Sequence, residues 1–188
     1  MKKKRFITIA VSICFSLHLF SLPARGSEAV IKDVLVAQSV DYIHLYAKVS
    51  NAVSKDMEAA ILAGMPTTIT FLVNLYQERF LWFDRQAASL VFKQAIKYNS
   101  VKKTFYVWLV NKSEPEGFQD LESAKRAMTE LNGVVVAQVR QLQKNKPTYI
   151  MIKAKLDRAR LPLGMEYVFF FASLWDFETD WYKQRFMF

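Results

Sequence analysis

The sequence predicts a mostly β, antiparallel, sandwich-like domain with two short helices, and a mixed α+β arrangement is the alternative class. Three observations support this prediction. Several segments alternate between apolar and polar residues with a period of two, as half-buried strands do. Both faces of several of these segments carry apolar residues, which is typical of strands covered by a second layer. Only two short segments carry helix-capping signals.

The period-two pattern predicts five strands. Within residues 41–50, Ile43, Leu45 and Val49 fall on one face and His44 on the other. Segments rich in valine add two further strands with high β propensity. The predicted strands cover residues 30–40, 41–50, 67–80, 89–98, 102–110, 134–142 and 148–159.

The two predicted helices cover about residues 54–63 and 121–132. Ser54 and Asp120 are suited to accept hydrogen bonds from the free amides of a first helical turn, so each is expected to be an N-cap. A glycine follows each segment and can adopt the left-handed conformation that ends a helix. These glycines are Gly64 and Gly133.

Two polar or mixed segments are predicted to be turns. Residues 143–147 separate two apolar runs and are expected to form a hairpin. Residues 81–86, "LWFDRQ", join two predicted strands. Trp82 and Asp84 in this segment either form a rim that faces a ligand or belong to a hairpin turn with packing aromatics, and the turn is favoured because Asp is common where strands end.

The N-terminus has the pattern of a signal peptide, which predicts export to the periplasm. Basic residues 2–5 precede an uncharged apolar run over residues 6–22. Ala24 and Gly26 then fit the −3 and −1 positions of a cleavage site, so the expected products are residues 1–26 and a single domain of residues 27–188. The alternative is an uncleaved helix that anchors the protein to the inner membrane.

Charge and cysteine content restrict the function classes. The chain has 26 basic and 17 acidic residues, a net charge of +9. Five of the basic residues and none of the acidic ones lie in residues 1–26, so the domain itself carries 21 against 17, or +4. No basic stripe of the kind that binds nucleic acid remains. Cys14 lies in the leader, so the domain is expected to contain no disulfide.

The residue inventory gives no catalytic, cofactor or metal site. His44 is the single histidine of residues 27–188, and it is expected to be a surface or half-buried strand residue. Without a thiol or a second histidine, zinc sets and Cys-based catalysis are excluded for the domain. The five glycines are too dispersed for a phosphate-binding loop.

The segment "WDFETDW" near the C-terminus places three carboxylates on alternate residues, Asp176, Glu178 and Asp180. We expect residues 167–181 to form a long strand with a break near residues 172–173 or 175–176. Its aromatic face, Trp175, Phe177 and Trp181, would anchor the C-terminus, and its acidic face would meet water and resist edge pairing. A basic segment with Arg158 and Arg160 precedes it. This segment is expected to be a solvated strand end, and contact with an anionic head group or an acidic partner is the alternative.

Several motifs occur in an order that resembles a bacterial envelope family catalogued as domain of unknown function 4390. These motifs are "GMPTTITFLVNL", "LWFD", "IKYNSVKKTFYVWL", "FQDLESAKRAM" and "TYIMIKAKLDRARLP". The resemblance implies an exported protein with no assigned activity and no catalytic residues to carry over. Genes of this family can neighbour a membrane sensor kinase of the nitrogen-regulation type, which implies a signalling role by association.

These observations favour a non-enzymatic binding or interaction module of the periplasm. Its aromatic content of 14% suggests that some aromatics line a groove or an interface. The expected partner is an envelope protein such as a membrane sensor kinase, or an apolar ligand between the sheets, and not nucleic acid. Membrane contact is expected to be transient, through residues 6–22.

Two alternatives remain open from the sequence. A small outer-membrane β-barrel fits the length of the mature chain and its aromatic end at Phe188. A carboxylate-dependent hydrolase would use Asp176, Glu178 and Asp180, although two carboxylates on one strand seldom flank a substrate.

Overall fold

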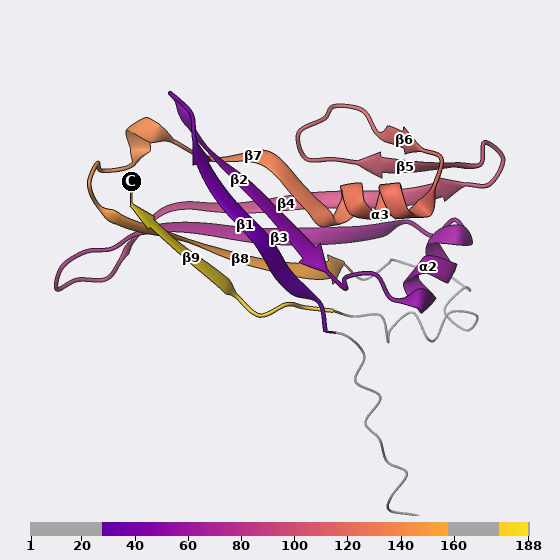
Figure 1. Cartoon of the computed structure of the whole chain (residues 1–188), viewed down its shortest axis with the longest axis horizontal. Coiled ribbons are helices and arrows are strands. Elements are labelled where there is room, and N and C mark those ends of the chain that lie inside the picture. The colour runs from indigo at the N-terminus through magenta and orange to yellow at the C-terminus, as the bar shows by residue number, and fades with distance from the viewer. Residues whose placement is uncertain (1–27, 158–176, 188) are drawn as a thin grey trace, which may run out of the picture.

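The computed structural model describes residues 28–157 and 177–187, and the strands in these ranges form two antiparallel sheets (Figure 1). A three-stranded sheet has the order β1-β2-β7, and a six-stranded sheet has the order β6-β5-β4-β3-β8-β9. The first contains β1 (Val30–Gln38), β2 (Tyr42–Ser50) and β7 (Glu130–Gln138). The second contains β3 (Thr67–Gln77), β4 (Arg85–Asn99), β5 (Thr104–Trp108), β6 (Glu116–Phe118), β8 (Pro147–Asp157) and β9 (Tyr182–Met187).

The two sheets form a sandwich-like arrangement, which confirms the predicted fold class. Strands β1 and β2 cross obliquely over the long strands of the six-stranded sheet (Figure 1). The predicted apolar faces of β2 and β3 both point into the shared core, where their side chains are almost fully buried. From β2 these are Ile43, Leu45, Ala47 and Val49, and from β3 they are Ile69, Phe71, Val73 and Leu75.

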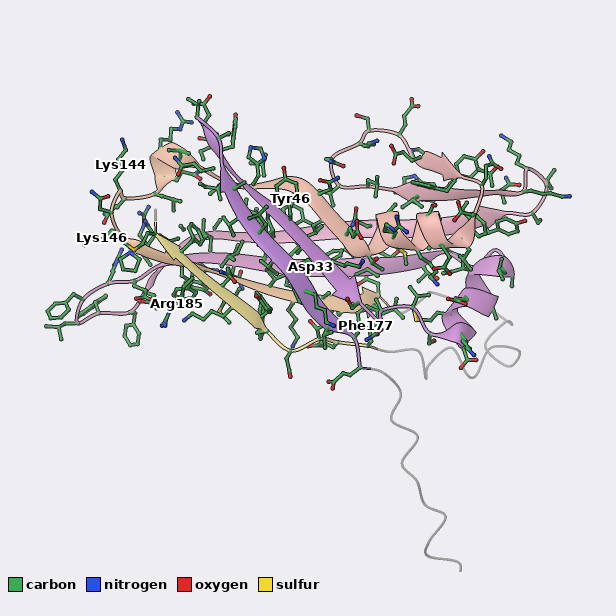
Figure 2. The ribbon with its side chains drawn as sticks, viewed as in Figure 1. Asp33, Tyr46, Lys144, Lys146, Phe177 and Arg185 are labelled. Carbon is green, nitrogen blue, oxygen red and sulfur yellow. The ribbon has the colours of Figure 1, made fainter. Side chains whose placement is uncertain are left out.

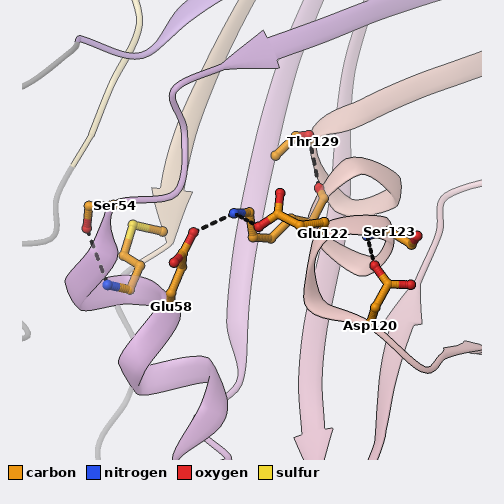
Figure 3. Close-up of polar contacts among 8 residues, drawn as sticks. Ser54, Glu58, Asp120, Glu122, Ser123 and Thr129 are labelled. Carbon is orange, nitrogen blue, oxygen red and sulfur yellow. Dashed lines mark hydrogen bonds and ion pairs between the residues drawn. The ribbon is translucent and has the colours of Figure 1, made fainter.

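The first helix, α2 (Lys55–Leu62), forms as the sequence predicts. The Ser54 hydroxyl accepts a hydrogen bond from the Met57 N–H at 3.3 Å and caps the first turn (Figure 3). Gly64 follows with a φ of 86°, the left-handed conformation expected after a helix.

The second helix, α3 (Leu121–Thr129), begins as predicted but ends three residues early. The Asp120 carboxylate accepts from the Ser123 N–H at 2.7 Å, and this bond lowers the pKa of Asp120 (Figure 3). The predicted end at residue 132 is wrong, because the chain turns directly into β7 at Glu130. Pairing of β7 with β2 overrides the helical pattern, and Gly133 lies within β7 with a φ of 68°.

The predicted hairpin at residues 143–147 is also wrong. The strand before this loop, β7, pairs with β2 in the three-stranded sheet, whereas β8 after it pairs with β3 and β9 in the other sheet. The loop therefore carries the chain from one layer to the other. Its polar composition indicates a turn, but it carries no information about which sheet each flanking strand joins.

The C-terminal region differs in part from the predicted long strand. Residues 158–176 lie outside the described residues, as does the predicted leader. Residues 177–181 form only an isolated bridge from Glu178 to Lys155, and the regular strand β9 begins at Tyr182. Phe177 packs against the core, as predicted. Trp181 was also predicted to anchor the C-terminus, and this is wrong, because its side chain is 40% exposed.

Among the described residues, none of the helices has the length and apolar character needed to cross a membrane.

Candidate binding site at the tip of the β3–β4 hairpin

The sequence-predicted site residues lie in two separate places. Trp82 and Asp84 lie in the turn between β3 and β4, as the favoured hairpin prediction expected. Glu178 and Asp180 are exposed near β8, where Glu178 bridges to Lys155. Asp84 contacts Tyr149, six residues before Lys155 on β8, so the two places lie roughly 20 Å apart along this strand. Arg158, Arg160 and Asp176 lie outside the described residues.

The turn presents four consecutive large apolar side chains to solvent. We call these residues the tip, and they are Phe80, Leu81, Trp82 and Phe83. Their exposed fractions run from 73% for Trp82 to 91% for Phe80. The turn prediction expected the aromatics to pack on the core, and this part of it is wrong. Burial of one such side chain stabilises a protein or complex by about 1.5–3 kcal/mol, which the tip forgoes while it is exposed.

The backbone of the tip is strained at one residue. Leu81 has a φ of 60°, in the left-handed region where an L-residue other than glycine costs about 1–2 kcal/mol. Its side chain is also 85% exposed, so neither packing nor backbone geometry accounts for a leucine at this position. Runs of exposed apolar residues and strained exposed positions both occur where a side chain has a binding role.

The base of the hairpin is held rigidly by Asp84. One carboxylate oxygen accepts from the Arg79 N–H at 3.3 Å and closes the loop, and the other accepts from the Tyr149 hydroxyl at 2.8 Å. Burial, followed by the bond to Asp84, raises the pKa of Tyr149 to about 12, so its hydroxyl stays protonated and keeps donating at physiological pH. The Tyr149 ring stacks on the Tyr76 ring, with the two centroids 5.1 Å apart. The Nζ of Lys183, on β9, lies 3.6 Å from the centroid of the Tyr149 ring.

A second set of contacts attaches the β7–β8 loop to the same base. The Gln77 side chain donates to the Gln143 carbonyl at 2.9 Å and accepts from the Gln143 N–H at 3.0 Å. The Glu78 N–H donates to the Pro147 carbonyl at 2.9 Å, and the Glu78 carboxylate pairs with Arg185 of β9 at 3.1 Å. Strands β3, β8 and β9 therefore form one support from which the tip projects.

The support carries an excess of positive charge. We call the six basic residues on this support and on the segments next to it the collar, and they are Arg79, Arg85, Lys144, Lys146, Lys183 and Arg185. Figure 2 shows Lys144, Lys146 and Arg185 at the same end of the molecule as the β3–β4 turn. The two acidic residues of the base, Glu78 and Asp84, are both engaged in the contacts described above, and among these eight described residues the basic ones exceed the acidic ones by four.

A family model described as a domain of unknown function, DUF4390, matches residues 26–185. This chain belongs to the DUF4390 family. The matched range contains both helices, the tip and every strand except the last two residues of β9. No curated protein and no solved structure gives a match to this DUF4390 domain.

One arrangement in this DUF4390 domain resembles part of a hydrolytic site. The His44 Nε2 lies 3.2 Å from the Ser39 Oγ, and its Nδ1 lies 3.2 Å from the Gly133 carbonyl oxygen. The Ser39 hydroxyl, however, donates to the Tyr42 carbonyl at 3.1 Å and accepts from the Tyr42 N–H at 3.2 Å. Ser39 is thereby engaged in closing the β1–β2 turn, and a backbone carbonyl stands where a catalytic triad has a carboxylate.

The acidic residues near the C-terminus are partly engaged as well. The Glu178 carboxylate pairs with Lys153, whose Nζ also lies 5.8 Å from the centroid of the Trp181 ring. Within residues 28–157 and 177–187, no group of three or more His, Cys, Asp or Glu side chains is arranged to hold a metal ion.

Sequence reasoning named Trp82 and Asp84 but missed Phe80, Leu81 and the tyrosine that fixes the base. The missed signal is the run "FLWF" between Arg79 and Asp84, because four apolar residues in a row are unusual in a turn. Tyr149 could not be found this way, since it is 65 residues from Asp84 in the chain.

Proposed function

We propose that this DUF4390 domain is a non-enzymatic binding module of the bacterial envelope, which binds its partner through the tip. The observation that carries the proposal is the run of four exposed apolar side chains on a rigid base. Exposed apolar residues in one contiguous patch mark sites where a protein binds another surface. A base fixed by hydrogen bonds reduces the loss of conformational freedom on binding.

Location in the envelope rests on the leader pattern of residues 1–26. A link to a membrane sensor kinase is supported by the family association alone, and it is compatible with a module that acts at the membrane surface. The tip would then be the contact that holds the domain close to its partner.

Hydroxyl-radical footprinting tests whether the tip is covered in the envelope. The full chain is oxidised in envelopes isolated from its host and, separately, after purification, and the modification of each tryptophan is measured by mass spectrometry. We expect the oxidation of Trp82 to fall at least fivefold in envelopes, because the bound surface excludes radicals.

Two other exposed tryptophans serve as internal controls. Trp108 and Trp181 are 43% and 40% exposed, lie away from the tip, and should change by less than twofold between the two preparations. Equal oxidation of Trp82 in both preparations would refute the proposal, as would recovery of the protein in the cytoplasmic fraction.

A further inference from the structure

We infer that the tip inserts into a phospholipid bilayer whose surface carries anionic head groups. This inference rests on the proposed function and names the partner. The shape of the tip, the position of the charges behind it and the rigidity of the support all favour a bilayer as the partner.

The shape of the tip fits a bilayer interface. The Trp82 and Phe83 rings meet edge to face with centroids 6.4 Å apart, and each of the four side chains is at least 73% exposed. Apolar surface therefore covers several sides of a projection. A protein groove would need a fixed shape complementary to every side of this projection. The interfacial region of a bilayer is fluid and adapts to the projection. Tryptophan and tyrosine are enriched in that region, because the apolar ring contacts the lipid chains while the polar group stays near the hydrated head groups.

The charges lie directly behind the apolar residues. Arg79 precedes Phe80 in the chain, and Arg85 follows Asp84 after Phe83. Lys144 and Lys146 approach from the β7–β8 loop, which the Gln77 and Glu78 contacts hold against the hairpin. When the tip enters the interface, these side chains reach the head-group level, where basic residues attract anionic lipids.

Two weak contributions, from the apolar side chains of the tip and from the basic collar, together give reversible attachment to the membrane. Four apolar side chains penetrate only the outer part of a bilayer, and a basic patch supplies the second contribution that a short apolar anchor needs. The electrostatic contribution should weaken as salt screens the collar. The domain would thus bind membranes peripherally through the tip, independently of residues 6–22.

Vesicle sedimentation tests the inference. The full chain is mixed with vesicles of phosphatidylglycerol and phosphatidylethanolamine, and with vesicles of phosphatidylcholine alone. We expect the Trp82→Ser, Phe83→Ser double variant to bind the anionic vesicles at least about tenfold more weakly than the wild type. Any contribution of the leader is the same in every protein compared, so the difference reports the tip.

Matched controls come from the β4–β5 turn, at the opposite end of the molecule (Figure 1). Val101→Ser replaces a residue that is 91% exposed there and should leave the affinity within twofold. The Lys144→Gln, Lys146→Gln pair should weaken anionic binding about tenfold, whereas Lys102→Gln, Lys103→Gln should not. Melting temperatures confirm that each variant is folded.

Fluorescence quenching then locates the inserted residue. Brominated lipids should quench part of the tryptophan emission of the bound wild type, and Trp82→Phe should remove that part. Unchanged anionic-vesicle binding by the Trp82→Ser, Phe83→Ser variant, or equal wild-type affinity for anionic and neutral vesicles, would overturn the inference.

Failure of the inference can be told apart from failure of the proposed function. If envelopes protect Trp82 from oxidation but neither kind of vesicle binds the tip, the partner is a protein, and only the lipid inference falls. If envelopes leave Trp82 unprotected, the proposed function falls with it.

Discussion

The hydrogen bond between Tyr149 and Asp84 is the contact that most directly positions the tip. It joins Asp84, the last residue of the β3–β4 turn, to strand β8, with 2.8 Å between the Tyr149 hydroxyl and the Asp84 carboxylate oxygen. The same carboxylate closes the loop on the Arg79 N–H. Loss of the hydroxyl would leave Asp84 with one partner and the tyrosine ring stacked in place.

We therefore predict that Tyr149→Phe lowers the free energy of unfolding by about 1.5 kcal/mol at neutral pH, because a hydrogen bond to a charged group is lost. The pKa of Tyr149, raised to about 12, also gives the difference a pH dependence. The unfolded tyrosine ionises near pH 10, so the contribution is fully present below about pH 10 and is lost as the pH rises towards 12.

Urea unfolding of both proteins at pH 7, 9, 10 and 11 measures this effect. The gap between wild type and variant should be constant up to about pH 9 and then narrow. A gap that stays constant through pH 11 would show that the hydroxyl is not held in its protonated form by the fold.

Residue-level prediction from the sequence succeeded where the signal was local. The sequence predicts the turn that contains Trp82 and Asp84, because turn chemistry depends on neighbours in the chain. The exposure of the aromatics was not predicted, because it depends on whether another element covers the turn. The same limit applies to Trp181, whose alternation with Asp180 suggested burial that the fold does not provide.

At the scale of elements, the two helices are joined by a lysine that bridges segments far apart in the chain. Lys125 of α3 pairs with Glu58 of α2 and, at 2.7 Å, with Glu122 of its own helix. Burial opposes the charge of Lys125, but the hydrogen bonds to Glu122 and Glu58 outweigh burial and raise its pKa. The lysine is therefore charged throughout the physiological range, and the bridge fixes one end of the sandwich.

A double-mutant cycle with Glu58→Ala and Lys125→Ala should give a coupling energy of about 1 kcal/mol, because the lysine side chain is only 18% exposed and screening is reduced. The Lys112–Glu116 pair is a matched control with more exposed partners and should give less than about 0.5 kcal/mol. Equal coupling in the two pairs would mean that the bridge between the helices contributes no more than an ordinary surface pair.

Element boundaries show why sequence patterns predict starts better than ends. Both N-caps were identified because Ser54 and Asp120 act on amides three residues away. The end of α3 was missed because it is decided by the pairing of Lys48 with Glu130, which are 82 positions apart in sequence. The three-residue strand β6 was missed for the same reason, since it exists through its pairing with β5.

At the scale of the whole molecule, one core joins the two sheets. Phe71 lies on the central strand β3 and is fully buried among side chains from both layers. The sequence predicted two layers from the apolar faces, but it did not assign β7 and β8 to different sheets. That assignment depends on strand partners, which the period-two pattern does not specify.

Phe71→Ala should lower the free energy of unfolding by about 3–5 kcal/mol, because it removes a large buried side chain and leaves a cavity. Val91→Ala, on the outer face of β4 where the valine is 60% exposed, should cost less than about 1 kcal/mol. Urea unfolding followed by circular dichroism and by tryptophan fluorescence measures both variants. Non-coincident transitions, or similar costs for the two variants, would contradict a single core shared by both sheets.

The closure of the β3–β4 loop by Asp84 on Arg79 has an evolutionary consequence. The register of the two strands is set by the pairing of β3 with β4, and the loop closes through the bond from the Arg79 N–H to Asp84. The four residues between Arg79 and Asp84 can thus be exchanged without changing the strands, since surface loops accept substitution and insertion more readily than the strands that carry them. On the proposed function, replacing this one short segment would change what the domain binds, while the strands that carry the segment stay unchanged.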